Sequence, residues 1–455
     1  MNRREFLKGA AAASALTGTS LPLVHAQGKD ELQVALVGAG GRGTGAASDA
    51  LSTQSKHGPI KLVAMADLNA GRMKQKVDQL KDGYAAQMDV PPERQFAGLD
   101  GFKKAMDCLK PGDIAIFATP PGFRWVFFQY AISKGLNVFL EKPVTVDGPT
   151  SRRMLELGEE ATKKNLKVGV GLMVRHCRGR QELEKRIRDG EIGEIVAARA
   201  YRMHGPVGYA FSKPKPKDKT DLQYQIERFH SFLWASGGLF SDFYIHQIDE
   251  VSWMKGAWPV SAHGLGGRHY KTDEIDQNFD SYHIEYTWPD GSKFFYDGRT
   301  MNGCKNEFFS GVHGTKGSAV VSLTGHTPGK VRTFSDQSMN EKKLLWAYPQ
   351  PERNPYQLEW EDLVDAVRKN TPYNEVKRGV EASVVTSMGR MAAHTGQIVT
   401  YDQMLNSPHE FAPGLDKLTA DSPAPLQPDA QGKYAIPTPG IKPDAFKEWR
   451  EYYQA

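Results

Sequence analysis

Residues 32 to 51, "LQVALVGAGGRGTGAASDAL", decide the fold of the N-terminal half of this chain. A β-branched and apolar run occupies residues 33–37, and glycines follow it directly at positions 38, 40 and 43. Each glycine has a physical reason: Gly38 for a tight turn, Gly40 for close approach to a pyrophosphate, and Gly43 for helix-on-strand packing. The spacing predicts a strand, a glycine-rich turn, and a helix whose N-terminal amides and dipole bind an anionic dinucleotide.

A second apolar stretch, "KLVAMAD", supports this interpretation because it ends in Asp67, which lies 24 residues beyond Gly43. An acidic residue at this distance is placed to accept hydrogen bonds from the adenosine ribose hydroxyls. Its charge would repel a 2′-phosphate, and no arginine immediately follows it. The sequence therefore predicts NAD as the cofactor, with NADP as the alternative.

Two further stretches predict strands at residues 113–121 and 137–143, with helical segments between them. Strands that alternate with helices indicate a doubly wound parallel sheet, which binds its ligand at the carboxyl edge. The second stretch ends in "EKP", which leaves Lys142 at that edge. The predicted cofactor-binding residues are Gly38, Gly40, Gly41, Arg42, Gly43, Asp67, Thr119, Pro120, Glu141 and Lys142.

The first 26 residues have the pattern of an export signal. A basic Arg3-Arg4 pair precedes an alanine-rich apolar run, and Val24-His25-Ala26 resembles a cleavage site. The arginine pair resembles the twin-arginine type of bacterial signal. The apolar run is too short and too weakly apolar to span a bilayer. We therefore expect a periplasmic protein that has no membrane attachment once residues 1–26 are removed.

Composition narrows the remaining classes. The chain has 455 residues, of which 40% are hydrophobic and 24% charged, and a formal net charge of +5. This length has room for two or three domains, and the mild positive charge, without a basic stripe, gives no support for nucleic-acid binding. The three cysteines allow at most one disulfide. No CxxC or HExxH motif occurs, so we expect no metal site.

The segment "GGLFSDFYIHQIDE", residues 237–250, predicts a helix that carries chemistry. Asp242, His246 and Asp249 follow one another at intervals of four and three, which stacks them on one helical face. A histidine can remove the hydroxyl proton of an alcohol, and a carboxylate one turn away can orient the ring. Lys142 at the same oxygen would stabilise a developing alkoxide. The predicted catalytic residues are therefore Lys142, His246 and Asp242.

These motifs together resemble the glucose–fructose oxidoreductase/inositol dehydrogenase (Gfo/Idh/MocA) family over residues 32–405. The resemblance implies an α/β protein with a Rossmann domain at 32–174 and a second α/β domain at 175–405. The second domain would carry an open, mostly antiparallel sheet. The proline content of the sequence itself predicts a tail at 406–455. The resemblance also implies NAD- or NADP-dependent oxidation or reduction of a secondary alcohol on a sugar or cyclitol. It places Lys142, Asp242 and His246 at the family's catalytic positions.

Further positions are candidate substrate contacts. Many relatives carry a histidine shortly after the "ATP" strand end, where this chain has Arg124. The alternative for each candidate is an ordinary packing or surface role, and for Asp249 it is pairing with a nearby cation. The candidates are Arg175, His230, Trp234 and Asp249, with Arg268 also considered.

An aromatic hairpin is predicted in the second domain. The segment "FDSYHIEYTWPDGSKFFYDG", residues 279–298, has Pro289-Asp290-Gly291 at its turn and one apolar, aromatic face. Packing of this face on helices or on another subunit is favoured over stacking on a sugar. Because members of the resembled family often associate through this sheet, we expect a homo-oligomer.

Three functions remain open. The first is a sugar or polyol oxidoreductase. The second is a glycosidase that keeps NAD and works by transient oxidation, elimination and water addition. The third is a sugar-binding protein without turnover. Export of a folded dinucleotide enzyme adds one expectation, since the periplasm offers no dependable pool of cofactor: the enzyme should keep its cofactor tightly bound.

Overall fold

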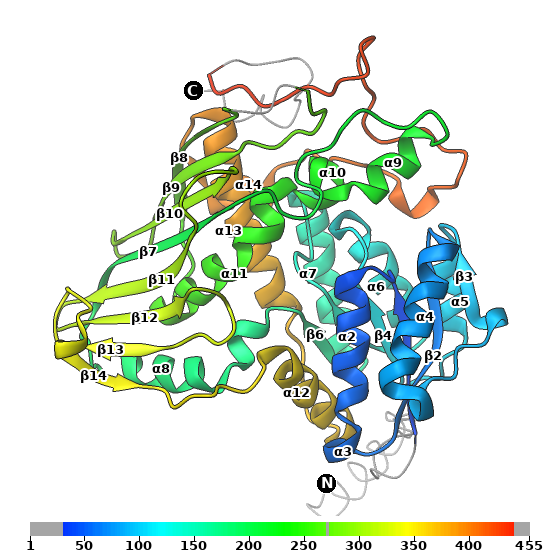
Figure 1. The fold of residues 1–455 in the computed structure, drawn as a ribbon, viewed down its shortest axis with the longest axis horizontal. Helices are drawn as coiled ribbons and strands as arrows, with labels where there is room; N and C mark the ends of the chain where they lie inside the picture. The colour runs from blue at the N-terminus through cyan, green and yellow to red at the C-terminus, as the bar shows by residue number, and fades with distance from the viewer. Residues whose placement is uncertain (1–30, 270–272, 441–455) are drawn as a thin grey trace, which may run out of the picture.

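A computed structural model describes residues 31–269 and 273–440 of the chain. The predicted signal at 1–26 and the last part of the predicted tail lie outside the described residues. Two sheets form the two halves of the molecule, and most of the N-terminal half lies to one side of the C-terminal sheet (Figure 1).

The N-terminal half is a six-stranded parallel sheet of order β3-β2-β1-β4-β5-β6, which confirms the predicted doubly wound sheet. Its strands are β1 (Leu32–Val37), β2 (Ile60–Asp67), β3 (Gln95–Ala97), β4 (Ile114–Phe117), β5 (Asn137–Leu140) and β6 (Val168–Val170). Its helices are α2 (Gly41–Ser52), α3 (Gln54–His57), α4 (Ala70–Tyr84), α5 (Gly101–Asp107), α6 (Arg124–Ser133) and α7 (Gly148–Lys163).

Strands β4 and β5 end earlier than the sequence predicted. The expected strands ran to residues 121 and 143, but β4 ends at Phe117 and β5 at Leu140. Pro121 instead begins a short 3₁₀ helix, η3 (Pro121–Phe123), because proline lacks the amide hydrogen that a sheet ladder needs. The residues after each strand end are thereby free to line a ligand site.

The glycine turn between β1 and α2 has the geometry that its spacing predicts. Gly38 has a φ of +96°, and a Cβ atom there would lie 2.6 Å from the Ala118 carbonyl oxygen. A Cβ on Gly43 would lie 2.0 Å from the Gly38 carbonyl oxygen, so helix α2 packs directly on the turn. Gly40, by contrast, has nothing within 4 Å of such an atom. Its outer side therefore faces open space, where a ligand can approach the backbone.

The C-terminal half is a nine-stranded sheet of order β14-β13-β12-β11-β7-β10-β9-β8-β15. Only the β7–β10 pair within it is parallel, which agrees with the predicted mostly antiparallel sheet. The strands are β7 (Ile195–His204), β8 (Ser261–Gly267), β9 (Ser281–Thr287), β10 (Lys293–Thr300), β11 (Glu307–Gly314), β12 (Ser318–Leu323), β13 (Arg332–Phe334), β14 (Leu344–Ala347) and β15 (Val399–Thr400).

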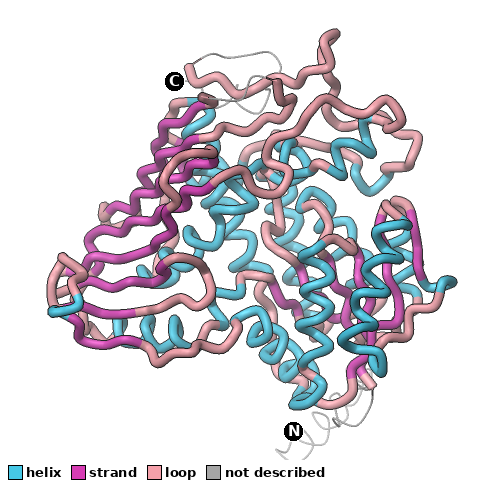
Figure 2. The backbone as a smooth tube through the Cα atoms, viewed as in Figure 1, coloured by secondary structure: helices cyan, strands magenta, loops and turns pink. Residues whose placement is uncertain are grey.

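Helices cover one face of this sheet and leave the other open (Figure 2). The predicted hairpin is present as β9 and β10, and its aromatic face, including Tyr286 and Trp288, is buried. On the open face, Leu265 is 66% exposed. The helices of this half are α8 (Arg178–Arg188), α9 (Asp221–Glu227), α10 (Leu233–Ser236), α11 (Gly238–Lys255), α12 (Pro355–Lys369), α13 (Val376–Thr395) and α14 (Tyr401–Asn406).

Helix α12 crosses the domain division that the sequence predicted. It falls within residues 175–405, yet Trp360 stacks on Phe139 of β5 with ring centroids 4.5 Å apart. Leu363 and Val364 join the same buried cluster as Leu36 of β1. The chain thus returns to the parallel sheet after building most of the second sheet, and α12 covers part of the Rossmann core.

The described part of the tail, residues 406–440, packs on its own chain. The Gln225 side-chain amide donates to the Leu426 carbonyl at 2.7 Å, and the Tyr434 ring lies 5.0 Å from that of Phe232. Gln277 donates to the Ala435 carbonyl at 3.3 Å. The tail therefore braces the segment around α9 and α10, as the red trace in Figure 1 shows.

Candidate active site

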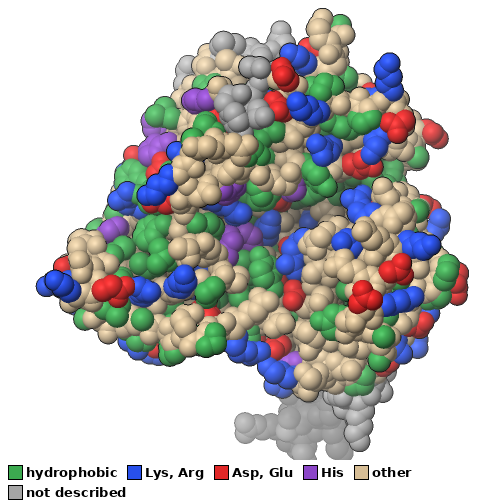
Figure 3. Space-filling view, viewed as in Figure 1, with side chains coloured by type: hydrophobic (Ala, Val, Ile, Leu, Met, Phe, Trp, Pro, Cys, Tyr) green, Lys and Arg blue, Asp and Glu red, His purple; other side chains and the backbone are tan. Residues whose placement is uncertain are grey.

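A cavity of about 560 Å³ lies where the carboxyl ends of the parallel strands face the second half. The surface is hollowed between the two halves, and Lys, Arg and His side chains gather there (Figure 3). All ten residues predicted to bind the cofactor line this cavity, as do the predicted catalytic residues Lys142, Asp242 and His246. The structure thus brings the two predicted sets into one site.

Asp67 is fixed at the end of the cavity formed by β2. Its carboxylate accepts hydrogen bonds from the amides of Ala39 and Asn69, both at 2.8 Å. Arg72, from the first turn of α4, lies 3.2 Å from the same carboxylate and also lines the cavity. The sequence interpretation missed this arginine because it considered only the residue directly after Asp67. Together with the open space beside Gly40, this cradle fits a dinucleotide.

Arg42, in the first turn of α2, lies between the glycine turn and helix α12. It pairs with Glu141 at 2.9 Å and with Asp49 at 3.0 Å, and its guanidinium lies 4.6 Å from the centroid of the Tyr356 ring. Nearby Glu359 is buried, and burial together with Glu141 raises the pKa of Glu359 well above its ordinary value. A protonated Glu359 adds no second negative charge beside Glu141. Helix α12 therefore helps to position Arg42 at the edge of the glycine turn.

Lys142 is held by helix α11. Its ammonium donates to the Asp242 backbone carbonyl at 2.7 Å and lies 3.5 Å from the Asp242 carboxylate. The other carboxylate oxygen is 3.0 Å from His230 Nε2. Because His230 Nδ1 accepts from the Tyr209 amide at 3.1 Å, Nε2 carries the proton and donates to Asp242.

Asp242 is ionised in this arrangement. Burial raises the pKa of the Asp242 carboxyl, but the charge of Lys142 and the contact with His230 outweigh burial and bring the pKa below its ordinary range. The carboxylate therefore fixes the Lys142 ammonium and the His230 ring at the cavity wall.

The expectation that Asp242 orients His246 is wrong in this structure. Asp242 bonds to Lys142 and His230, and His246 Nδ1 is buried without a hydrogen-bond partner among the described residues. Helical spacing places both side chains on one side of α11 but does not fix where each one turns. Burial, followed by the charges of Lys142 and Arg202, lowers the pKa of His246 well below its ordinary value. His246 is thus a neutral imidazole, as a proton acceptor must be.

Two residues that the sequence analysis did not identify also line the site. His326 lies in the loop after β12, with its ring 4.6 Å from that of His246. Arg202 of β7 donates to His326 Nε2 at 3.2 Å. No motif surrounds either residue. The sequence feature that could have indicated Arg202 is its position on the buried side of β7, which pairs with β10 of the predicted hairpin.

Arg124, the noted departure from the family pattern, lies at the cavity edge. It is 2% exposed and donates to the Glu141 carbonyl at 2.9 Å and to the Thr119 hydroxyl at 2.7 Å. Burial lowers the pKa of Arg124 to about 10. The side chain therefore ties together the segments that follow β4 and β5, both of which line the cavity.

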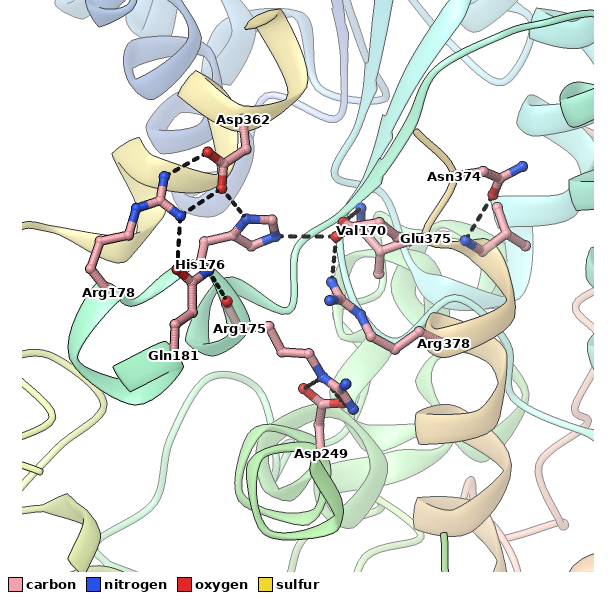
Figure 4. A network of polar contacts seen from close by, with 11 residues as sticks. Val170, Arg175, His176, Arg178, Gln181, Asp249, Asp362, Asn374, Glu375 and Arg378 are labelled. Carbon is pink, nitrogen blue, oxygen red and sulfur yellow. Dashed lines mark hydrogen bonds and ion pairs between the residues drawn. The ribbon is translucent and has the colours of Figure 1, made fainter. Parts of the chain in front are cut away.

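Arg175 and Asp249, two predicted substrate contacts, do not line this cavity. They pair with each other, with Arg175 Nη2 2.8 Å from the Asp249 carboxylate, and Asp249 is fully buried. Figure 4 shows the pair beside a polar network that links the 3₁₀ helix η4 (Met173–His176) to α12 and α13. Asp249 therefore pairs with a nearby cation, which was the alternative to a substrate contact.

Trp234 and Arg268 also lie away from the cavity lining, whereas His230 is part of it. The Trp234 indole donates to Gln225 at 2.8 Å and its ring meets that of Phe123 edge-on. Arg268 pairs with Asp276 at 3.1 Å. Trp234 thus has a packing role and Arg268 an ion-pair role. Of the five candidate substrate contacts, His230 is the one that lines the cavity.

Neither a metal cluster nor a membrane span occurs in the described part of the chain. Within residues 31–269 and 273–440, no group of three or more His, Cys, Asp and Glu side chains could hold a metal ion. In the same ranges, no helix has the length and apolar character needed to cross a bilayer. The three cysteines, at positions 108, 177 and 304, are free.

Two family models match the chain. The Gfo/Idh/MocA oxidoreductase family model with an NAD-binding Rossmann fold matches residues 32–172, and the Gfo/Idh/MocA C-terminal domain model matches residues 180–320. Together they cover more than half of the chain.

Curated relatives include an inositol 2-dehydrogenase of Corynebacterium glutamicum, which is 25% identical over 39% of this chain and 44% of the relative. The rhizopine catabolism protein MocA of Rhizobium meliloti is 20% identical over 67% of this chain and 82% of that protein. The chain spans less than half the length of the inositol 2-dehydrogenases that it matches.

Solved structures of similar fold cover 82% of this chain. An aldose–aldose oxidoreductase from Caulobacter crescentus, complexed with glycerol, aligns over its full length with a TM-score of 0.62 and 16% identity. A scyllo-inositol dehydrogenase from Lactobacillus casei, with bound NAD(H) and scyllo-inositol, aligns over 99% of its length with a TM-score of 0.59 and 18% identity.

Proposed function

Because this chain belongs to the Gfo/Idh/MocA oxidoreductase family, we propose that it transfers hydride between a nicotinamide cofactor and a secondary alcohol of a carbohydrate or cyclitol. The observation that carries the proposal is one cavity in which the glycine turn, Lys142 and His246 meet. The same cavity provides a dinucleotide cradle and a neutral base beside a fixed cation.

When bound, the cofactor supplies the hydride acceptor or donor, and the chain's own residues manage the proton. His246, kept neutral by burial, accepts the hydroxyl proton of the alcohol. The Lys142 ammonium stabilises the negative charge that develops on the same oxygen. Asp242 and His230 hold that ammonium in place. Asp242 is therefore a positioning residue for Lys142 rather than for His246.

The cofactor that we propose is NAD rather than NADP. Both oxygens of the Asp67 carboxylate are aligned by backbone amides at the cavity edge, where they can accept from a ribose diol. Arg72 pairs with this carboxylate, so the positive charge of Arg72 is already partly neutralised and is less available to a 2′-phosphate. Tighter binding of NADP than of NAD by the purified protein would refute this choice.

We further propose export by the twin-arginine route and retention of the cofactor through many turnovers. Support comes from the arginine pair at residues 3 and 4 and from the clamp that Arg42 and Tyr356 form beside the glycine turn. A ligand that binds only the folded state also stabilises it by mass action. The test is to purify the exported protein, denature it and quantify released nucleotide. About one nucleotide per chain supports retention, and an empty protein refutes it.

One observation favours the second candidate, a glycosidase that works through transient oxidation. Elimination and water addition need a second acid or base, and the His326 ring lies 4.6 Å from that of His246. Nitrophenyl glycosides, tested without added cofactor, separate the two functions. Sustained release of nitrophenol indicates the glycosidase, whereas reduction of the nicotinamide by free sugars or inositols without such release indicates the dehydrogenase.

A further inference from the structure

Arg202 is a cation in the cavity wall that has no carboxylate partner among the described residues. It lies on β7, where residues 198, 200 and 202 pair with residues 294, 296 and 298 of β10, on the buried face of the sheet. It lines the cavity together with His246 and His326. Its side chain therefore points to the substrate half of the site, across from the glycine turn.

The hydrogen bonds of Arg202 go only to neutral acceptors. The guanidinium donates to the Phe243 carbonyl, to His326 Nε2 at 3.2 Å and to His204 Nε2 at 3.3 Å. Its Nη2 atom has no hydrogen-bond partner in residues 31–269 and 273–440.

Three of the other four Lys and Arg side chains of the cavity pair with carboxylates. Lys142 pairs with Asp242, Arg42 with Glu141, and Arg72 with Asp67. Arg202 has no such ion pair in the part of the chain that the structure describes. Arg124 has no ion pair either among the described residues, but it donates to the Glu141 carbonyl and the Thr119 hydroxyl on the side of the parallel sheet. Arg202 is therefore the cavity arginine without a carboxylate partner that lies on the side of the second sheet, beside His246 and His326.

The surroundings of Arg202 provide aromatic faces but no anion among the described residues. The Phe243 and Phe308 rings lie 5.4 and 5.8 Å from its guanidinium carbon. Burial lowers the pKa values of His246 and His326 well below the ordinary value, and the charge of Arg202 lowers them further. The imidazoles thus stay neutral and supply no countercharge. Charges in such partly apolar settings are normally paired, so a missing anion is indicated.

We propose that Arg202 binds a carboxylate of the substrate, so that the carbohydrate oxidised or reduced here is a sugar acid such as a uronate or an aldonate. This inference rests on the proposed function, because it names the substrate class of the same site. A guanidinium fork matches a carboxylate in shape and charge. A phosphate dianion would call for more than one free cation, and the neighbouring imidazoles are neutral.

The geometry also places the carboxylate relative to the reacting carbon. His326 connects the two positions, since its Nε2 is 3.2 Å from Arg202 and its ring is 4.6 Å from that of His246. The carboxylate subsite therefore lies one imidazole away from the proposed base. A six-carbon sugar acid, with its alcohol at His246 and its carboxylate at Arg202, spans such a separation.

The test compares matched substrates on the purified protein: glucose with glucuronate, galactose with galacturonate, and glucose with glucose 6-phosphate. Readouts are kcat/KM for nicotinamide reduction and, separately, ligand binding by tryptophan fluorescence. We expect kcat/KM for each uronate to exceed that for its neutral partner by roughly 10- to 100-fold, the range of a charge-assisted hydrogen-bonded pair.

Variants of β7 make the comparison specific. Arg202→Gln should abolish the preference for uronates, and Arg202→Lys should keep part of it. Arg199→Gln is the matched control, because Arg199 lies on the same strand, is exposed and packs over the Tyr201 ring. We expect this control to retain the full preference.

Several results would overturn the inference. These are equal or better use of the neutral sugars, a preference for the phosphate over the uronates, or an unchanged preference in Arg202→Gln. Failure of the proposed function gives a different result, namely no hydride transfer with any compound. In that case the binding measurement still decides whether Arg202 recognises a carboxylate.

Discussion

At the scale of single residues, the proposed chemistry depends on Lys142 and His246. Replacing either by Ala should lower kcat by roughly 10²-fold or more, as for the loss of an acid–base group or an oxyanion stabiliser. The steady-state rate with a saturating substrate measures the effect, and a circular dichroism spectrum checks folding. Trp234→Phe is a control, since Trp234 lies outside the cavity and donates to Gln225. Near-normal turnover of His246→Ala at neutral pH would show that α11 is only structural.

The pH dependence of activity follows from the environment of His246. Burial, together with Lys142 and Arg202, lowers the pKa of this histidine well below its ordinary value. Because the base works in its neutral form, kcat/KM should stay level as pH falls through about 6.5, the ordinary histidine value, and decline only at lower pH. A profile measured for alcohol oxidation tests this. A half-loss of activity near pH 6.5 or above would contradict it.

Individual site residues could be predicted where a motif fixes them. Lys142 follows a strand end in "EKP", and His246 lies on a helix that begins at Gly238. The spacing of α11 also suggested Asp249, which follows His246 by three residues, but its carboxylate pairs with Arg175 at 2.8 Å and does not line the cavity. Arg202 and His326 come from a strand and a loop without a motif. Only the three-dimensional pairing of β7 and the course of the loop after β12 bring them to the site.

The β1–α2 turn is the element on which cofactor binding depends. Gly43→Ala would place Cβ 2.0 Å from the Gly38 carbonyl oxygen, so α2 must move away from the turn. We expect a loss of nucleotide affinity of at least about tenfold, together with a lower melting temperature. Equilibrium titration with NAD and thermal unfolding measure both.

Gly83 in α4 supplies the matched control for that substitution. Nothing lies within 4 Å of a Cβ atom at this exposed helical position. Gly83→Ala should therefore leave NAD binding unchanged and stabilise the protein by roughly 0.5–1 kcal/mol. If Gly43→Ala behaved like this control, the turn would not have the tight packing that we describe.

Contacts of His176 where η4, α12 and α13 meet should make the free energy of unfolding depend on pH. His176 lies between Asp362 at 2.8 Å and Glu375 at 3.2 Å (Figure 4). Burial lowers the pKa of His176, but Glu375 and Asp362 outweigh burial and raise it overall. The stabilisation is therefore complete below the unfolded value of about 6.5 and is lost as pH rises through the higher folded value.

Denaturant unfolding on both sides of this window tests the contribution of His176. His176→Gln should cost about 1.5–3 kcal/mol at pH 6, the range for hydrogen bonds to charged groups, and less at pH 9. A cost that does not change with pH would contradict a charged histidine. Replacing exposed His263 of β8 in the same way is the control, because its side chain has no carboxylate partner among the described residues.

At the scale of the whole molecule, the parallel sheet could be predicted because its signal is local. The glycine turn with alternating strands and helices indicates the parallel sheet. The hairpin pattern indicates one pair of strands, and the open second sheet was implied by the family resemblance. The return of α12 to the parallel sheet could not be predicted, since the pairing of Trp360 with Phe139 joins residues far apart in sequence. The same applies to the tail, whose contacts with Gln225 and Phe232 depend on the completed second half.

The central claim is that this cavity transfers hydride between a carbohydrate carbon and a nicotinamide. The most direct measurement uses a sugar acid deuterated at each ring carbon in turn, followed by mass spectrometry of the nicotinamide recovered from the protein. Our account predicts deuterium in the cofactor from one ring position, at a rate that falls by roughly 10²-fold or more in Lys142→Ala. Contradiction would be a cofactor that gains no deuterium from any of the labelled compounds or their neutral counterparts while the protein remains folded and nucleotide-bound.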